Sequence, residues 1–188
     1  MKKIIAATVL AFAAVSATAA SYEIDPKHTN ARFMIDHFGT SSNVGGVYEI
    51  EGSMEFNPAK RIGSVDITLP LANLRSSSDA FTGHLKSADL FHADKFPEMR
   101  FQSTKFHFVG KKVVAVSGNL TLLGKTHPVK LRANKFNCYN SPMLKTEVCG
   151  GDFTTTIDRT KWGMDYLVSA GMSKKVRLDI QIEAAKNN

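Results

Sequence analysis

The sequence lacks most of the motifs that mark enzymes and metalloproteins. Its six histidines form no His-x-x-x-His pair, and none stands near a cysteine at the spacing of a zinc site. It also contains no Gly-x-Ser-x-Gly nucleophile elbow and no glycine-rich phosphate loop. We therefore expect no catalytic residues and no metal ion.

Cysteine is scarce, and the two that are present favour structure over redox chemistry. Cys138 and Cys149 are not part of a Cys-x-x-Cys motif, which redox catalysis would need. An even pair in an exported chain predicts a disulfide. The loop between the two cysteines is rich in turn residues, and closing it would stabilise the fold by about 3 kcal/mol.

Long apolar runs are also missing. A transmembrane helix needs roughly 20 apolar residues, and the apolar run over 4–15 is shorter. It follows two lysines and precedes Ala17-Thr18-Ala19, which is the pattern of a secretory signal peptide with its cleavage site. No cysteine stands at that site to carry a lipid. We predict that 1–19 is a cleaved signal peptide and that 20–188 forms a single domain in the periplasm or outside the cell.

The charge is moderately basic and spread along the chain. The net charge of +7 falls to +5 when Lys2 and Lys3 leave with the signal peptide, and the remaining lysines do not cluster. A concentrated basic surface attracts nucleic acid or anionic membranes. Because the charges are dispersed, we expect a solvated exterior and no nucleic-acid partner.

The sequence is rich in alternating apolar and polar residues, the pattern of a half-buried β-strand. The alternation is strongest over 48–56, where apolar residues alternate with glutamates. The stretch 113–131 predicts a hairpin with its turn at Leu123-Gly124-Lys125. The predicted strands cover 31–37, 48–56, 65–69, 99–108, 113–122, 129–134, 153–157 and 176–182.

Two segments depart from this simple alternation. Over 71–95 the pattern predicts a crossover with one or two short helices. The first helix is capped by Ser78 or Asp79 and turns Phe81 towards the barrel. Within 99–108 the apolar phase shifts, which indicates a bulge.

Eight amphipathic strands joined mostly in sequence predict an all-β fold. An eight-stranded antiparallel barrel fits best because closure leaves no exposed sheet edge. A two-sheet sandwich is the alternative. A barrel of this size is either filled by its own side chains or hollow enough for one small ligand, and periodicity does not choose between the two.

Four motifs follow one another between Tyr22 and Ala184. They are Asp25-x-x-His28 with Phe33 and His37-x-Gly39; His84 to Phe91 with Phe96-Pro97 and Phe101; Gly118 to Val129; and Asp158-Arg159-x-x-Trp162-Gly163. Together they resemble the YceI-like family of bacterial periplasmic polyisoprenoid-binding proteins. The resemblance implies a lipocalin-like barrel with a lipid-sized internal cavity. That cavity would hold the isoprenoid tail of a quinone such as ubiquinone, or of a related polyprenyl lipid, for transport or storage.

Apolar burial alone is sufficient to hold such a tail. Each buried CH₂ contributes about 0.8 kcal/mol, so a five-carbon unit contributes roughly 3 to 4 kcal/mol. Several units outweigh the approximately 4 to 15 kcal/mol that binding costs in rigid-body freedom. Two alternatives stay open: an enzyme that acts on such a lipid, and a filled barrel whose basic exterior binds a partner or a membrane.

Inward-facing residues of the predicted strands are the candidates for the cavity wall. They are Phe33, Ile35, Tyr48, Ile50, Ile67, Phe101, Val116, Leu120, Leu131, Phe153, Leu178 and Ile180. Trp162 and Tyr166 either line the entrance or anchor their loop on the barrel. His37 either bonds the head group of the ligand or is structural. The expected partners are an isoprenoid lipid and, during loading, a transient membrane contact; the oligomeric state stays open.

Overall fold

Each predicted strand contains a β-strand in the computed structural model, which describes residues 19–187. The strands in this part of the chain are β1 (Ala20–Ile24), β2 (Asn30–His37), β3 (Ser41–Tyr48), β4 (Glu51–Asn57), β5 (Ile62–Pro70), β6 (Leu74–Ser76), β7 (Glu98–Val109), β8 (Lys112–Leu122), β9 (Lys125–Asn140), β10 (Glu147–Asp158) and β11 (Lys175–Lys186). The helical elements are α1 (Asp79–Lys86) and the 3-10 turns η1 (Pro26–His28), η2 (Leu71–Asn73) and η3 (Arg159–Trp162). Within 19–187, no helix is long and apolar enough to cross a membrane. The predicted signal peptide lies outside the described residues except for Ala19.

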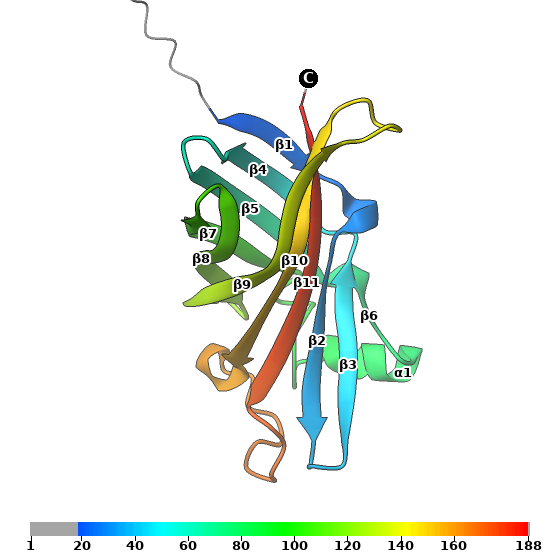
Figure 1. The fold of residues 1–188 in the computed structure, drawn as a ribbon. Helices are drawn as coiled ribbons and strands as arrows, with labels where there is room; N and C mark the ends of the chain where they lie inside the picture. The colour runs from blue at the N-terminus through cyan, green and yellow to red at the C-terminus, as the bar shows by residue number, and fades with distance from the viewer. Residues whose placement is uncertain (1–18, 188) are drawn as a thin grey trace, which may run out of the picture.

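The strands form one antiparallel sheet that closes on itself. Eight of them make a ring in the order β1-β4-β5-β7-β8-β9-β10-β11, and β1 closes it by pairing with both β4 and β11. β2 and β3 extend the sheet alongside the first half of β11, and the short β6 pairs with β3 (Figure 1). The predicted eight-stranded antiparallel barrel is confirmed, and the two-sheet sandwich is excluded.

The Asp25-x-x-His28 motif forms a bend between β1 and β2. Asp25 caps η1: its Oδ1 accepts a hydrogen bond from Lys27 N (2.9 Å), and its Oδ2 lies 2.6 Å from Nδ1 of His28. Because of this bend, the chain pairs with β4 before η1 and with β3 after it. The alternation pattern does not predict β1, β3 or β6.

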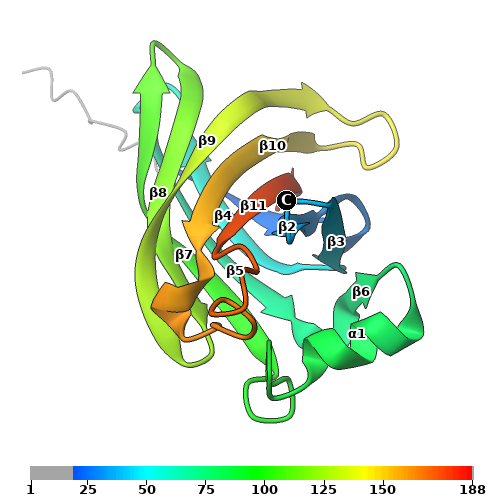
Figure 2. The same ribbon diagram turned by 90° about the horizontal axis from the view of Figure 1, so that it is seen from below.

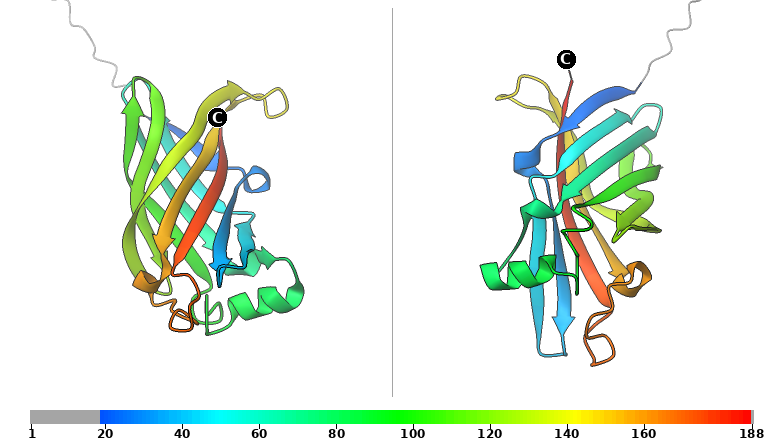
Figure 3. Two further views of the ribbon diagram at one scale, coloured as in Figure 1. Left: turned by 60° about the horizontal axis from the view of Figure 1, so that its bottom comes forward. Right: turned by 180° about the vertical axis from the view of Figure 1, so that it is seen from behind.

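The predicted short helix is confirmed as α1. Ser78 caps it, since its Oγ accepts a hydrogen bond from Phe81 N (3.2 Å). Phe81 and Leu85 turn towards the interior of the barrel. Seen from below, α1 lies beside β6, next to the end of the sheet (Figure 2). Two further views show α1 and the segment 163–174 at the same end of the barrel (Figure 3).

The predicted bulge is present in β7. Its pairing with β8 shifts register between Ser103 and Lys105, and again between His107 and Phe108. The first shift changes which side chains of β7 point inward. As a result, Phe106 is buried in the barrel.

An aromatic cluster closes the end of the barrel away from α1. Phe56 lies opposite Ala20 at the start of β1. Its ring centroid lies 6.2 Å from those of Phe106 and Phe108 and 5.2 Å from that of Phe136. We call these four phenylalanines the aromatic floor, because their rings pack against one another inside this end of the barrel.

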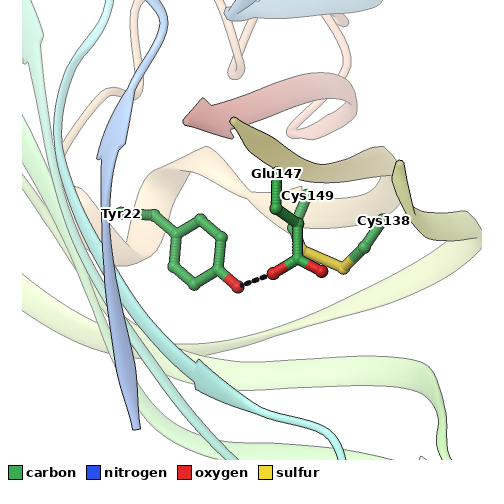
Figure 4. The surroundings of a disulfide bond; sticks show 4 residues. All are labelled: Tyr22, Cys138, Glu147 and Cys149. Atoms are coloured by element: carbon green, nitrogen blue, oxygen red, sulfur yellow. Dashed lines mark hydrogen bonds between the residues drawn. A yellow bond between two sulfur atoms is a disulfide. The ribbon is translucent and has the colours of Figure 1, made fainter. Parts of the chain in front are cut away.

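The predicted disulfide is confirmed. Cys138 in β9 and Cys149 in β10 lie opposite each other and are bonded, with an S–S distance of 2.01 Å. Beside them, the hydroxyl of Tyr22 donates to Oε1 of Glu147 (2.5 Å; Figure 4). Burial, together with this hydrogen bond, raises the pKa of Tyr22, so the phenol remains a donor. A structural disulfide is consistent with export to an oxidising compartment.

Candidate functional site

The barrel is hollow. Its interior contains a cavity of about 330 Å³, within the range of roughly 300 to 1,000 Å³ that is usual for ligand sites. The wall consists of inward side chains from the long strands and from the crossover around α1, and most of them are apolar. Periodicity leaves open whether the barrel is filled or hollow, and the structure shows that it is hollow.

Most residues that the sequence proposes for the wall or entrance do line this cavity. Because the sheet preserves the alternation over most of its length, most residues predicted to share the inner face still share it. The candidates that line the cavity are Phe33, Ile35, Ile50, Ile67, Phe101, Val116, Leu120, Leu131, Phe153, Tyr166, Leu178 and Ile180.

Tyr48 does not line the cavity, so its predicted inward position is wrong. It is 41 % exposed and lies on the outer face, in a groove with Arg32 and Arg75. The prediction treats 48–56 as one strand, but Glu49 has a φ of 51° and breaks it. The break resets the alternation, so that Val47 takes the inward place.

Trp162 does not line the cavity either; it anchors its loop on the barrel. The residue is 2 % exposed, and its Nε1 donates a hydrogen bond to the carbonyl of Leu120 (3.0 Å). Its ring packs edge-on against His127, with centroids 5.1 Å apart. Trp162 therefore fixes the segment after β10 to the hairpin of β8 and β9.

The crossover supplies wall residues that are absent from the candidate set. Leu90 and Phe91 follow α1 and line the cavity together with Phe81 and Leu85. The ring of Phe91 lies 6.1 Å from that of Phe33 in β2. The apolar inner side of the predicted helix was the signal that could have placed this segment on the wall.

Polar side chains gather at one end of the cavity. These residues, which we call the polar end, are His37, Asn43, His84, Arg159 and Tyr166. His37 and Asn43 lie next to the start of β11 and one strand further out, respectively, since Ile35 of β2 pairs with both Val176 and Asn43. Arg159 follows the end of β10, which pairs with the same start of β11. The carbonyl of Tyr166 accepts a hydrogen bond from Arg159, and its ring lies 5.3 Å from that of His84.

The Asp158-Arg159-x-x-Trp162-Gly163 motif builds part of the polar end. Asp158 caps η3: its Oδ1 accepts hydrogen bonds from Oγ1 (2.6 Å) and N (3.1 Å) of Thr160. The bond from the Thr160 hydroxyl contributes most to holding the pKa of Asp158 below its usual range. Gly163 ends the turn with a φ of 83°, in the left-handed region that favours glycine.

Among the described residues that line the cavity, Arg159 is the one Lys, Arg, Asp or Glu residue. It is 2 % exposed, and its guanidinium ties two distant parts of the loop together, since Nε donates to Ser173 O (3.0 Å) and Nη2 donates to Tyr166 O (2.9 Å). Burial lowers the pKa of Arg159, although Asp165 and Asp158 act in the opposite direction. A guanidinium remains charged even so.

Outside the polar end, the described part of the wall has one polar side chain, Thr29, and its hydroxyl is already satisfied. The hydroxyl of Thr29 donates to Glu183 O (3.3 Å) and accepts from Glu183 N (3.1 Å). No cluster of three or more His, Cys, Asp or Glu side chains that could hold a metal ion occurs within 19–187. The wall as a whole can therefore bury an apolar chain along most of its length and meet a polar group at one end.

Comparisons with known proteins agree with this architecture. A family model described as "YceI-like domain" matches residues 22–184. A UPF0312 protein of Pseudomonas putida strain W619 is 33 % identical over 192 residues, which cover 99 % of this chain and 98 % of that protein.

Solved structures share the fold. The crystal structure of a YceI protein from Campylobacter jejuni matches with a TM-score of 0.67 and 22 % identity, covering 77 % of this chain and 85 % of that one. A structure described as a polyisoprenoid binding domain from Saccharophagus degradans matches with a TM-score of 0.64 and 12 % identity, covering 89 % and 99 % of the two chains. From the family match and the identity along nearly its whole length, the chain belongs to the YceI-like domain family.

Proposed function

We propose that the protein binds an isoprenoid lipid, with the tail inside the barrel, and acts as a carrier or reservoir for it. The observation that carries this proposal is the largely apolar cavity of about 330 Å³ inside the barrel. The Saccharophagus degradans neighbour, described as a polyisoprenoid binding domain, supports the ligand class. A filled barrel that acts only through its exterior does not fit a hollow interior.

The wall matches what an isoprenoid tail needs. Each five-carbon unit gains roughly 3 to 4 kcal/mol when it leaves water. The wall offers branched aliphatic and aromatic side chains over most of its area, so the tail itself provides the binding free energy. The polar end then orients the head group, and binding, not catalysis, is the activity that we propose.

The ligand we favour is an isoprenoid quinone such as ubiquinone, held in the periplasm. The disulfide between Cys138 and Cys149 fits an oxidising compartment, and the predicted signal peptide would direct the chain there. Quinones combine a long isoprenoid tail with a compact head that carries oxygen acceptors. That combination fits an apolar cavity with one polar end.

We further propose that the loops at the polar end touch a membrane while the lipid is loaded. Phe38 and Leu167 are large apolar side chains that remain exposed there, at 43 % and 40 %. Phe38 is in the turn between β2 and β3 and lies close to Gly171 of the neighbouring loop. An apolar rim of this kind suits contact with a bilayer surface.

Binding to delipidated protein tests the ligand class. Ubiquinone, a polyprenyl phosphate and palmitate are each titrated into the wild-type protein, and bound lipid is measured after gel filtration. We expect the two isoprenoids to co-elute with the protein and palmitate to bind more weakly. Exclusive binding of palmitate would assign the cavity to straight chains, and no binding by any of the three would refute the carrier function.

A further inference from the structure

The guanidinium of Arg159 has unused donors in the cavity wall. Its two hydrogen bonds, to the carbonyls of Ser173 and Tyr166, use Nε and Nη2. The remaining nitrogen, Nη1, makes no hydrogen bond to any residue of the described chain. Since a guanidinium carries five N–H donors, Arg159 can still bind an acceptor that enters the cavity.

The charge of Arg159 also lacks a close partner. None of the ion pairs within 19–187 involves it. The neighbouring Asp158 is occupied by Thr160 and lies 3.7 Å from Lys174, and Asp165 is exposed. Arg159 is only 2 % exposed, and Asp165 and Asp158 compensate its charge only in part, which is unfavourable. An oxygen-bearing group in the cavity would compensate it.

We infer that Arg159 binds an oxygen atom of the ligand's head group and so fixes the direction in which the lipid lies. The inference rests on the proposed function. The head lies at the polar end, and the tail points to the aromatic floor. The acceptor is a quinone carbonyl or a phosphate oxygen, because both accept charge-assisted hydrogen bonds from a guanidinium.

The two ends of the cavity differ enough to set this direction. β10 runs from one to the other: Gly151, near its start, pairs with Phe136 of the aromatic floor, and its last residue precedes Arg159. At roughly 3.3 Å per residue, about 25 Å of strand separates these positions. A head group turned towards the floor would meet phenyl rings and leave its oxygens unsatisfied, which is costly in a buried site.

Affinity measurements with three probes test the inference. Wild-type protein and Arg159→Met are titrated with ubiquinone, a polyprenyl phosphate and squalene, an isoprenoid hydrocarbon without oxygen. Loss of a charged hydrogen bond should weaken binding of the oxygenated probes by about 10- to 100-fold and leave squalene unchanged. Arg132→Met is the matched control, since Arg132 is exposed on β9 and its loss changes the net charge equally.

Each outcome decides between specific recognition and a structural role. A similar loss for squalene, or no loss for either oxygenated probe, would overturn the inference while leaving the proposed function intact. If wild-type protein binds none of the three, both fail. A larger loss for the phosphate than for ubiquinone would identify an anionic head as the preferred partner, and the reverse would identify the quinone.

A measurement on the wild-type protein covers the case in which Arg159→Met does not fold. Arginine side chains are labelled with ¹⁵N, and the resonances of Arg159 are followed by NMR during titration. They should shift on addition of ubiquinone or the polyprenyl phosphate and stay in place on addition of squalene. Shifts of equal size with all three probes, or none with the oxygenated pair, would contradict head-group binding.

Discussion

The cavity can be filled from a single wall position. Val116 lies in β8, is 3 % exposed and lines the cavity. Val116→Phe places a ring in space that the lipid tail would occupy. If the ring displaces one five-carbon unit, the lost burial is roughly 3 to 4 kcal/mol, which corresponds to an affinity about 100- to 1,000-fold weaker. Because the cavity of about 330 Å³ has room for the ring, the free energy of unfolding of the delipidated protein should fall by less than the roughly 1 to 3 kcal/mol that is typical of overpacking a filled core.

The same substitution at Val114 provides a matched control. Val114 is in the same strand but is 38 % exposed, and it has no paired residue in β7 because the register shifts there. Val114→Phe should therefore leave the affinity within about twofold of wild type, as for most surface substitutions. Ubiquinone titration gives the affinities, and urea unfolding gives the stabilities. Wild-type affinity in a folded Val116→Phe variant, or an equal loss in Val114→Phe, would refute tail binding at this wall.

Three further predictions address the wall, the disulfide and a surface ion pair. Leu120→Glu should abolish lipid co-purification or unfold the barrel, because it places a carboxylate in an apolar wall. The control variant Asn119→Glu, at an exposed position, should retain lipid. A folded Leu120→Glu variant with normal lipid content would contradict the placement of Leu120 in the cavity wall. Cys138→Ser should lower the free energy of unfolding by about 3 kcal/mol in a urea titration, and two free thiols in denatured, unreduced wild-type protein would disprove the disulfide. The hydrogen bond to Asp25 raises the pKa of His28. The stabilisation from raising this pKa is therefore complete below the unfolded pKa of about 6.5 and is lost as pH rises through the raised folded value. An NMR titration that places the pKa of His28 at or below about 6.5 would contradict this prediction.

The strands were predictable because their two faces meet different surroundings. In β4, Met54 and Phe56 are buried, whereas Glu51 and Glu55 are exposed. A barrel imposes this difference along every strand, so the sequence records it as alternation. The order from β7 to β10 followed from the same pattern, since short connections join these neighbours, but β1 was not predicted and the predicted strand over 31–37 lies outside the ring as β2.

Two breaks in the strands, unlike the bulge within 99–108, were not predictable from alternation. A glutamate rarely has a positive φ, so nothing at Glu49 marks the break that turns Tyr48 outward. The bulge beside Val114 likewise arises from how β7 and β8 pair, and a single strand's pattern does not contain its partner's register. Each of these local changes places an apolar side chain on the outer face of the sheet, where alternation predicts the inner face.

Burial of the loop after β10 depends on contacts between distant residues. Trp162 bonds the carbonyl of Leu120, 42 residues earlier, and Arg159 bonds that of Ser173, 14 residues later. The motif that contains both residues predicts the family but not which side chain faces the cavity. The presence of a cavity was not predictable for the same reason, because it depends on how all eight strands close together and not on any single strand.

The central claim is that the barrel holds an isoprenoid lipid, and native mass spectrometry tests it most directly. The full-length protein is expressed in its own host or in a quinone-producing one, purified without detergent, and measured before and after organic extraction. The account predicts an adduct that extraction removes and that matches an isoprenoid quinone or polyprenyl lipid in the extract. Repeated preparations that carry no lipid, or only straight-chain fatty acids, would contradict it.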